Sequence, residues 1–239
     1  MTTKPTGPLF KWFGSKWLAS KLYPPPEHDV IFELFAGSAG YSLRHHEKQV
    51  VIWDANEQLQ ELWSWLIKYA TTESVLEIPI GTPEGADIRT LGLCRGQALL
   101  LKHWQRTNNV GDCWTISPWG NKPGQWTANT RARVAEELHA VKHWKLEQVR
   151  PDRPGTYFID PPYAYNYRYR FKEFDYAALV RKIAMIPKGS QIIVCEAACQ
   201  KTGRVPDYLP FEPFGSRITS RRKATENHHS KEYLYHEHR

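Results

Sequence analysis

The tetrapeptide Asp160-Pro161-Pro162-Tyr163 has the residue types that can hold an amino group for reaction. It follows residues 156–159, an apolar run typical of a buried strand. Two consecutive prolines fix the backbone, and we expect them to leave the carbonyls there without competing local donors. The carboxylate and an adjacent carbonyl could then accept both hydrogens of an exocyclic amine, which makes its nitrogen nucleophilic, while the tyrosine stacks on the attached ring. The alternative is a strand end that is merely stiffened by proline.

A second group of residues follows two further apolar runs. Residues 36–40 (Ala-Gly-Ser-Ala-Gly) have small side chains, which permit a ligand to approach the backbone closely. Asp54 stands 17 residues after Gly37, where a carboxylate can accept hydrogen bonds from both ribose hydroxyls of a nucleoside. The sequence contains neither GxGxxG nor GxxxxGK[ST], which disfavours NAD and ATP. A plain tight turn is the competing interpretation of residues 36–40.

The predicted elements place both groups at strand ends. Strands are predicted over residues 30–35, 50–53, 156–159 and 191–195, with a closing pair near 218–220 and 233–235. Helices are predicted near 41–46, along an apolar face from Leu59 to Ala70, near 97–106, after an N-cap at Thr130, and near 175–186. This alternation predicts an α/β fold with a mostly parallel sheet and a closing antiparallel strand. Ligands then belong at the carboxyl ends of the strands, so we expect residues 33–40, Asp54 and residues 160–163 to meet in one crevice.

The composition is that of a folded protein. The chain has 239 residues, of which 41% are hydrophobic and 24% charged, and this excludes disordered, collagen-like and coiled-coil classes. No apolar stretch approaches the roughly 18 to 20 residues of a membrane span, and the first five residues are too polar for a signal peptide, so we expect a soluble cytoplasmic protein. The four cysteines form no CxxC pair, which argues against a zinc site or a disulfide framework.

The net charge of +7 is unevenly distributed along the chain. Residues 22–88 carry three basic and eleven acidic side chains, whereas residues 89–150 carry ten basic and four acidic ones. Such segregation suits a polyanion such as nucleic acid, and a solvated basic surface is the alternative. Pattern and charge together predict three segments: the N-terminal part of a core over residues 1–75, an inserted basic region over residues 76–148, and the C-terminal part of the core over residues 149–239.

These motifs resemble those of the Dam-type DNA adenine methyltransferases, the α-group of amino-methyltransferases that use S-adenosylmethionine and carry a DPPY motif. The resemblance covers nearly the whole chain and keeps the family's motif order. Residues 10–16 (Phe-Lys-Trp-Phe-Gly-Ser-Lys) resemble KWxGxK, residues 33–38 resemble the cofactor turn, residues 54–56 resemble the ribose-binding acid with its Asn, residues 174–175 resemble the segment after the catalytic loop, and residues 231–234 resemble the closing strand.

The resemblance implies a Rossmann-like S-adenosylmethionine-dependent methyltransferase fold, and it implies roles for particular residues. Contacts with S-adenosylmethionine would come from Trp12, Lys16, Asp54 and Asp160, and its pocket would be lined by Glu33, Phe35, Gly37 and Ser38. A flipped adenine would be held for methyl transfer to N6, without a metal, by Asp160, Pro161, Pro162 and Tyr163. Residues 76–148 would be the target-recognition region for double-stranded DNA, with Lys11 reaching a base and Lys122, Arg131 and Arg133 on phosphates.

Two departures from the family pattern stand out. Ala39 occupies the place of a second glycine in the cofactor turn, and since Gly40 follows we expect the turn to be shifted by one residue. The insertion lacks the Asn/Arg-rich signature of GATC-specific relatives, which leaves the recognition sequence open. Methylation of cytosine N4 by the same chemistry and a DNA-binding module without activity remain the alternatives. We expect a bacterial or phage-encoded monomer, with a dimer on DNA as the second option.

Overall fold

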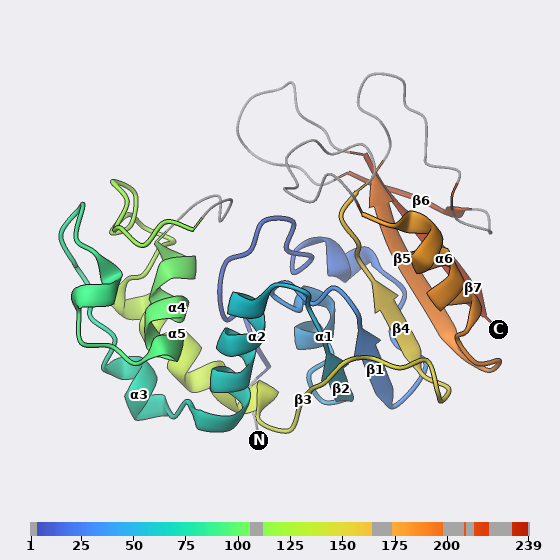
Figure 1. The fold of residues 1–239 in the computed structure, drawn as a ribbon, viewed down its shortest axis with the longest axis horizontal. Coiled ribbons are helices and arrows are strands. Elements are labelled where there is room, and N and C mark those ends of the chain that lie inside the picture. The colour runs from blue at the N-terminus through green and yellow to red at the C-terminus, as the bar shows by residue number, and fades with distance from the viewer. Residues whose placement is uncertain are drawn as a thin grey trace. The chain divides into compact units, whose positions relative to one another are not determined.

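In a computed structural model of the protein, residues 4–105, 112–163, 174–197, 208, 213–219 and 231–238 are described. The described residues contain one sheet of seven strands (Figure 1). These are β1 (Val30–Glu33), β2 (Gln49–Ile52), β3 (Lys145–Leu146), β4 (Thr156–Ile159), β5 (Gln191–Ala197), β6 (Pro213–Thr219) and β7 (Lys231–His238). Their order across the sheet is β3-β2-β1-β4-β5-β7-β6.

The pairing of the strands confirms the predicted α/β class. β1 runs parallel to β2 on one side and to β4 on the other, and β4 runs parallel to β5. β7 runs antiparallel to both β5 and β6 and closes the sheet. This mostly parallel sheet is compatible with a Rossmann-like fold. The chain goes from β1 to β2 on one side and later returns to β4 on the other side of β1, so a topological switch point lies between β1 and β4.

The helices are short, and side-chain caps define several of their starts. They are α1 (Gly40–Arg44), α2 (Glu57–Ser64), α3 (Thr72–Leu76), α4 (Arg95–Trp104), α5 (Ala128–Glu137) and α6 (Tyr176–Ala184), with 3-10 turns at Ala19–Leu22, Ile88–Thr90 and Leu138–Val141 and a π-helical turn at Trp65–Tyr69. Asn56 caps α2 by accepting from the backbone N–H groups of Gln58 and Leu59. No helix among the described residues has the length and apolar character needed to cross a membrane.

Most predicted elements are present, with bounds that differ by a few residues. The predicted strand over 156–159 coincides with β4, and the closing strands are longer than predicted, although Ser220 lies outside the described residues. The predicted cap at Thr130 is wrong. Thr127 caps α5 instead, because its Oγ1 accepts the backbone N–H of Thr130 at 3.4 Å, so the helix begins earlier. The five-residue α3 and the two-residue β3 were not predicted, since neither is long enough to show a periodic pattern.

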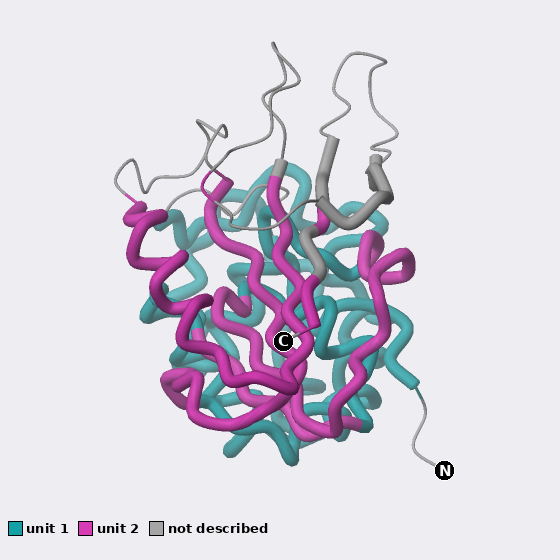
Figure 2. The backbone as a smooth tube through the Cα atoms, turned by 90° about the vertical axis from the view of Figure 1, so that its right-hand side faces the viewer, with its two compact units in different colours: residues 1–17, 37–47, 54–146 teal, residues 18–36, 48–53, 147–239 magenta. Residues whose placement is uncertain are grey.

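The chain divides into two compact units (Figure 2). Unit 1 comprises residues 1–17, 37–47 and 54–146, and unit 2 comprises residues 18–36, 48–53 and 147–239. Unit 1 holds α1 to α5 and β3, and unit 2 holds α6 and the other six strands. The predicted insertion over residues 76–148 falls almost entirely in unit 1 together with residues 54–75, so its existence as a separate region stays a prediction.

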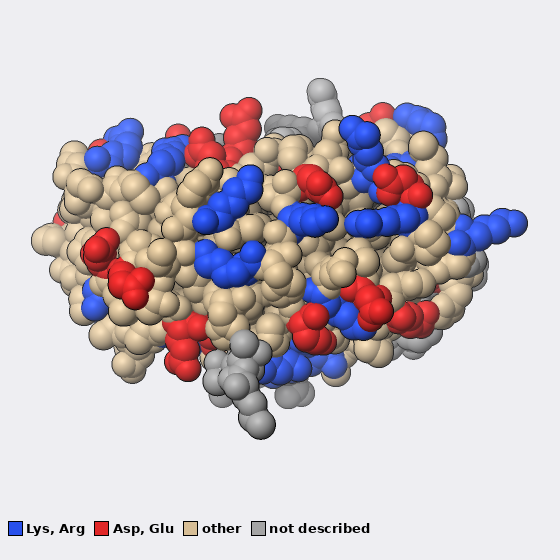
Figure 3. Space-filling view, turned by 90° about the horizontal axis from the view of Figure 1, so that it is seen from below, with Lys and Arg blue, Asp and Glu red and all other residues tan. Residues whose placement is uncertain are grey.

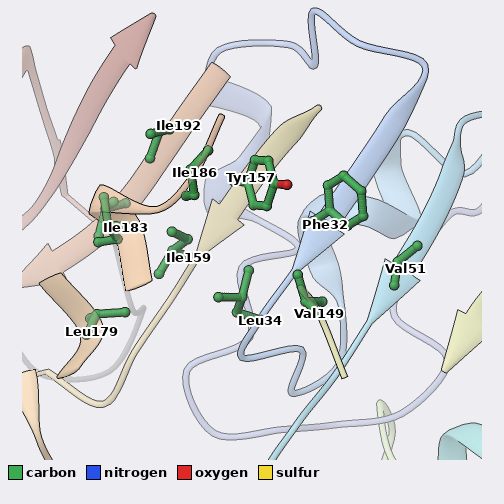
Figure 4. Close-up of a cluster of buried hydrophobic side chains, with 11 residues drawn as sticks. Phe32, Leu34, Val51, Val149, Tyr157, Ile159, Leu179, Ile183, Ile186 and Ile192 are labelled. Carbon is green, nitrogen blue, oxygen red and sulfur yellow. The ribbon is translucent and has the colours of Figure 1, made fainter. Parts of the chain in front are cut away.

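The core of unit 2 lies between α6 and the sheet (Figure 4). Leu179 and Ile183 of α6 pack against side chains from the strands, among them Tyr157 and Ile159 of β4. Alternate residues of a strand face the same side, so these two β4 side chains share one face of the sheet. Each is fully buried and stabilises the fold by about 1.5 to 3 kcal/mol. This packing fixes the end of β4, from which Asp160 follows directly.

Candidate functional site

The predicted site residues fall into two groups, one in each unit. Unit 1 holds Trp12, Lys16, Gly37, Ser38 and Asp54, and unit 2 holds Glu33, Phe35 and the corner formed by Asp160, Pro161, Pro162 and Tyr163. The meeting of both groups in one crevice stays a prediction. The geometry within each group can be described directly.

The turn before α1 has two residues in the left-handed region. Gly37 has a φ of 48°, and Ala39, the N-cap of α1, has a φ of 48° and a ψ of 44°. The left-handed conformation costs a non-glycine residue about 1–2 kcal/mol. Gly40 meets a different need, because a Cβ there would lie 2.3 Å from the backbone nitrogen of Trp17. The residue that follows Ala39 is therefore a glycine because the N-terminal segment passes too close for any side chain.

Asp54 is tied to this turn and to the start of α2. Its Oδ2 accepts the backbone N–H of Gly37 at 2.9 Å, and its Oδ1 accepts the backbone N–H of Asn56 at 2.9 Å. Burial raises the pKa of Asp54, and the two backbone donors act against that rise. Each carboxylate oxygen retains a further acceptor position after these bonds. The residue can therefore accept from two neighbouring hydroxyl groups while it remains ionised.

Trp12 lies directly against the same turn. A Cβ on Gly37 would lie 2.6 Å from Trp12 Cδ1, so only glycine leaves room for the indole. Trp63 fixes the turn from α2 by donating its indole N–H to the Gly37 carbonyl at 2.9 Å. On α4, the ring centroid of His103 lies 5.6 Å from that of Trp12. The turn thus has a flat aromatic side chain beside polar backbone groups, as a nucleoside site requires.

The segment that carries Trp12 has further ties within unit 1. The Ser38 hydroxyl donates to Ser15 Oγ at 2.8 Å, which joins the turn to the N-terminal motif. Lys16 is 5% exposed, and its ammonium group donates to the Gly14 carbonyl at 2.9 Å. A buried ammonium group needs acceptors around it, and Gly14 supplies one of them. Unit 1 therefore brings together Trp12, Lys16, Gly37 and Ser38 from the KWxGxK and cofactor-turn motifs.

In unit 2 the corner after β4 has a donor that was not expected. The Tyr176 hydroxyl at the start of α6 donates to the Pro162 carbonyl at 2.7 Å. The prediction concerned donors that are near in the chain, and the donor to Pro162 is instead a distant residue. Prolines remove only their own N–H groups, and this donor comes from 14 residues further along the chain.

Glu33 and Phe35 flank the switch point of the sheet. Glu33 is the last residue of β1, its side chain is buried, and its carbonyl accepts the backbone N–H of Trp53 at 3.0 Å. Phe35 is half-buried and lies edge-on to Phe174, with 5.6 Å between the ring centroids. The carboxyl ends of β1 and β4 therefore carry a buried carboxylate, an aromatic ring and the proline corner.

The predicted DNA contacts differ in how they are held. Lys11 donates to Gln125 Oε1 at 2.7 Å, and burial lowers its pKa. Arg131 donates to the Ile78 carbonyl at 3.0 Å. Arg133 donates to Glu137 Oε2 at 2.5 Å and to the Pro8 carbonyl at 2.8 Å. Lys122 is exposed and lies 5.9 Å from the ring centroid of the exposed Trp119.

These four basic residues are therefore not equivalent. The guanidinium groups of Arg131 and Arg133 already have acceptors inside unit 1, whereas the ammonium group of Lys122 lies at the surface. Contact of all four with DNA stays a prediction. On the face shown in Figure 3, Lys and Arg side chains lie among Asp and Glu side chains and do not form one basic patch.

Two residues of the site were not predicted from the sequence. Tyr176 carries no motif signal, since it is simply the first residue of a helix. His103 lies in α4 and packs against the rings of Phe10 and Trp12, at centroid distances of 5.3 and 5.6 Å. A histidine within an apolar helical run was the only available signal for it, and that pattern is common in protein cores.

We expect His103 to make the protein less stable in mild acid. Burial, together with the charge of Lys102, lowers the pKa of His103 to about 3. The unfolded chain takes up this proton below about pH 6.5 and the folded chain does not, so the stabilisation is complete above pH 6.5 and is lost as the pH falls towards 3. Between pH 7 and pH 5 the free energy of unfolding should drop by about 2 kcal/mol from this group.

Urea unfolding at pH 7 and pH 5 measures that drop. His103→Phe keeps a flat ring at this position and should show a smaller drop than the wild type by about that amount. His143→Gln, which changes an exposed histidine of the same unit, should leave the drop as it is. Equal drops for the wild type and His103→Phe would contradict the prediction.

The assignment of both groups rests on their geometry and on the motif resemblance. The chain matches no protein-family model, and a search of curated proteins gives no match.

Proposed function

We propose that the chain is an S-adenosylmethionine-dependent methyltransferase that modifies N6 of adenine in double-stranded DNA. The observation that carries the proposal is the position of the Asp-Pro-Pro-Tyr corner. It follows β4 at the topological switch point between β1 and β4, where open α/β sheets bind their ligands. A rigid acidic corner at that place suits an enzyme that holds an amine for reaction better than it suits a purely structural turn.

The residues of unit 1 fit a nucleoside. The Asp54 carboxylate has acceptor positions for the two ribose hydroxyls, and the Trp12 indole offers a flat surface beside the Gly37 turn. S-adenosylmethionine, when bound, supplies a methyl group on a positively charged sulfur. We assign the Asp54 carboxylate to the ribose of this molecule and the Trp12 indole to the flat face of its base. Lys16 and Ser38 are assigned to holding the backbone segments that surround the molecule.

The residues of the corner have separate parts in binding the target amine. The Asp160 carboxylate and the Pro161 carbonyl accept the two N6 hydrogens and so direct the nitrogen lone pair away from the ring. Tyr163 stacks on the base, which must leave the duplex because its N6 is not accessible within the stack. The Pro162 carbonyl accepts from Tyr176, and we assign it no part in binding the amine.

The chemistry of the transfer is a single displacement. The nitrogen forms a bond to the methyl carbon as the bond from that carbon to sulfur breaks, and the sulfur leaves as a neutral thioether. The methylated nitrogen then loses one proton, and the Asp160 carboxylate is placed to receive it. The reaction needs no metal ion as Lewis acid, because the charge on the sulfur already activates the methyl group.

Methyl transfer from radiolabelled S-adenosylmethionine to unmethylated plasmid DNA tests the proposal directly. Digestion of the product to nucleosides should place the label in N6-methyldeoxyadenosine. Label in N4-methyldeoxycytidine would instead support the alternative base. No label, combined with retention of the DNA on the protein in a filter-binding assay, would support a binding module without activity. Matched RNA in a parallel reaction should remain unlabelled.

A further inference from the structure

The corner after β4 is braced by a hydroxyl group that belongs to a residue 14 positions further along the chain. Tyr176 is the first residue of α6, and Asp175 caps this helix by accepting the backbone N–H of Ala178 at 2.8 Å. The Tyr176 hydroxyl donates to the Pro162 carbonyl at 2.7 Å. Neither proline carries an N–H group, so the Tyr176 hydroxyl adds a contact that holds the Pro162 carbonyl in one orientation.

Tyr176 is in turn held by neighbouring aromatic rings. The ring centroid of Tyr208 lies 4.7 Å away and that of Phe174 lies 4.9 Å away, with Phe174 edge-on. Phe174 also contacts Phe35, which follows β1. Such ring pairs are worth about 0.5–1.5 kcal/mol each beyond the area that they bury. The hydroxyl of Tyr176 is therefore aimed by packing on more than one side of its ring.

Glu196 of β5 completes the arrangement. Its side chain is fully buried, and Tyr208 donates its hydroxyl to Glu196 Oε2 at 2.5 Å. Val194 of β5 is the register partner of Ile159 of β4, so Glu196 lies two residues beyond the level at which β4 ends. Burial and the charge of Glu196 raise the pKa of Tyr176 to about 12, so its hydroxyl is protonated at neutral pH, as that of an ordinary tyrosine also is.

We propose that Tyr176 is a positioning residue for the proposed methyl transfer. Tyr176 orients the Asp-Pro-Pro-Tyr corner through the Pro162 carbonyl. It is itself held by Tyr208, which Glu196 holds in turn. This inference rests on the proposed function. It explains why the buried carboxylate of Glu196 lies at the end of β5, although Glu196 belongs to none of the motifs. It also divides the roles within the corner: the Pro162 carbonyl is used for bracing, and the Asp160 carboxylate and Pro161 carbonyl are assigned to the amine.

A positioning role has a kinetic signature that a purely structural role lacks. Tyr176→Phe removes one oxygen atom and keeps the ring packing, so the protein should stay folded with a nearly unchanged melting temperature. We expect kcat for methyl transfer to plasmid DNA to fall by about 10- to 100-fold, because misplacing reacting groups by an ångström has effects of this size. The KM for S-adenosylmethionine should change by less than about twofold, since the Trp12 and Asp54 group is untouched.

The partners of Tyr176 provide the second measurement. Tyr208→Phe should lower kcat in the same direction by a smaller factor, and the double variant should be no slower than about Tyr176→Phe alone, because both changes act through one hydrogen bond. Tyr69→Phe, which alters a tyrosine that is 69% exposed, is the matched control and should have the kcat of the wild type.

The outcomes separate this inference from the proposed function. If the wild-type protein transfers no methyl group to DNA, the proposed function is overturned and the positioning role falls with it. If the wild type is active and Tyr176→Phe retains its kcat, only the positioning role is overturned. A fall in kcat that is accompanied by a clear fall in melting temperature and in the affinity for S-adenosylmethionine would also overturn it, since this would show a general structural role.

Discussion

Replacing Asp160 with alanine is expected to abolish methyl transfer and to leave the fold intact. Its carboxylate is proposed to contact the reacting amine, and loss of a group that acts at the reacting atoms lowers kcat by on the order of a thousandfold. Asp160 follows β4, whose position is fixed by the core beneath α6 rather than by this side chain. The melting temperature should therefore change little.

Incorporation of radiolabelled methyl groups into DNA measures the loss of activity of Asp160→Ala, and two further variants serve as controls. Asp160→Asn keeps the shape and one acceptor oxygen, so we expect an intermediate activity. Asp152→Ala, which changes an exposed aspartate before β4, should have the activity of the wild type. Turnover of Asp160→Ala within about tenfold of the wild type would remove the carboxylate from the reaction and with it the central part of the proposal.

Gly40→Ala is expected to destabilise the protein, although helix propensity alone predicts the opposite. Alanine in place of glycine within a helix normally stabilises it by about 0.5–1 kcal/mol. Here the new Cβ would lie 2.3 Å from the backbone nitrogen of Trp17 and 2.9 Å from the backbone carbon of Lys16. Backbone cannot swing aside as a flexible side chain does, so we expect a net loss of about 2–3 kcal/mol.

The same substitution should weaken cofactor binding, because the displaced segment carries Trp12 and Lys16. Calorimetric titration with S-adenosylmethionine should show a rise in Kd of about tenfold or more, corresponding to at least about 1.4 kcal/mol. Gly81→Ala is the matched control: its φ is 67° and no atom lies within 4 Å of the new Cβ, so it should cost only backbone strain of about 1–2 kcal/mol and leave Kd unchanged. Stability of Gly40→Ala equal to that of the wild type would show that the close approach is not maintained in solution.

The sequence predicted the parts of the site that depend on local pattern. β4 ends where its apolar run meets Asp160 and the two prolines, and Asp54 follows closely after β2. Both outcomes depend on residues that are neighbours in the chain, so patterns of hydrophobic and turn-forming residues suffice. For this reason the sequence alone was enough to predict that residues 160–163 follow one strand and that Asp54 follows another.

The parts that the sequence did not predict depend on contacts between distant residues. Tyr176 reaches Pro162 from 14 residues further along the chain, and His103 reaches Trp12 from a helix much further along. The contact of Arg133 with phosphates stays a prediction, and its bonds to Glu137 and the Pro8 carbonyl had no signal in the sequence. Charge and type are visible in a sequence, but the partner that satisfies a side chain is decided only by tertiary packing.

The bond from Arg133 to Pro8 has a consequence for how the chain acquires its structure during synthesis. It spans 125 residues, and Thr6, two positions earlier, donates its backbone N–H to Glu137 at 2.7 Å across 131 residues. The first segment therefore leaves the ribosome long before its partners exist. Contacts of such high sequence separation form slowly. We expect the segment around Thr6 and Pro8 to be among the last portions of the chain to become ordered.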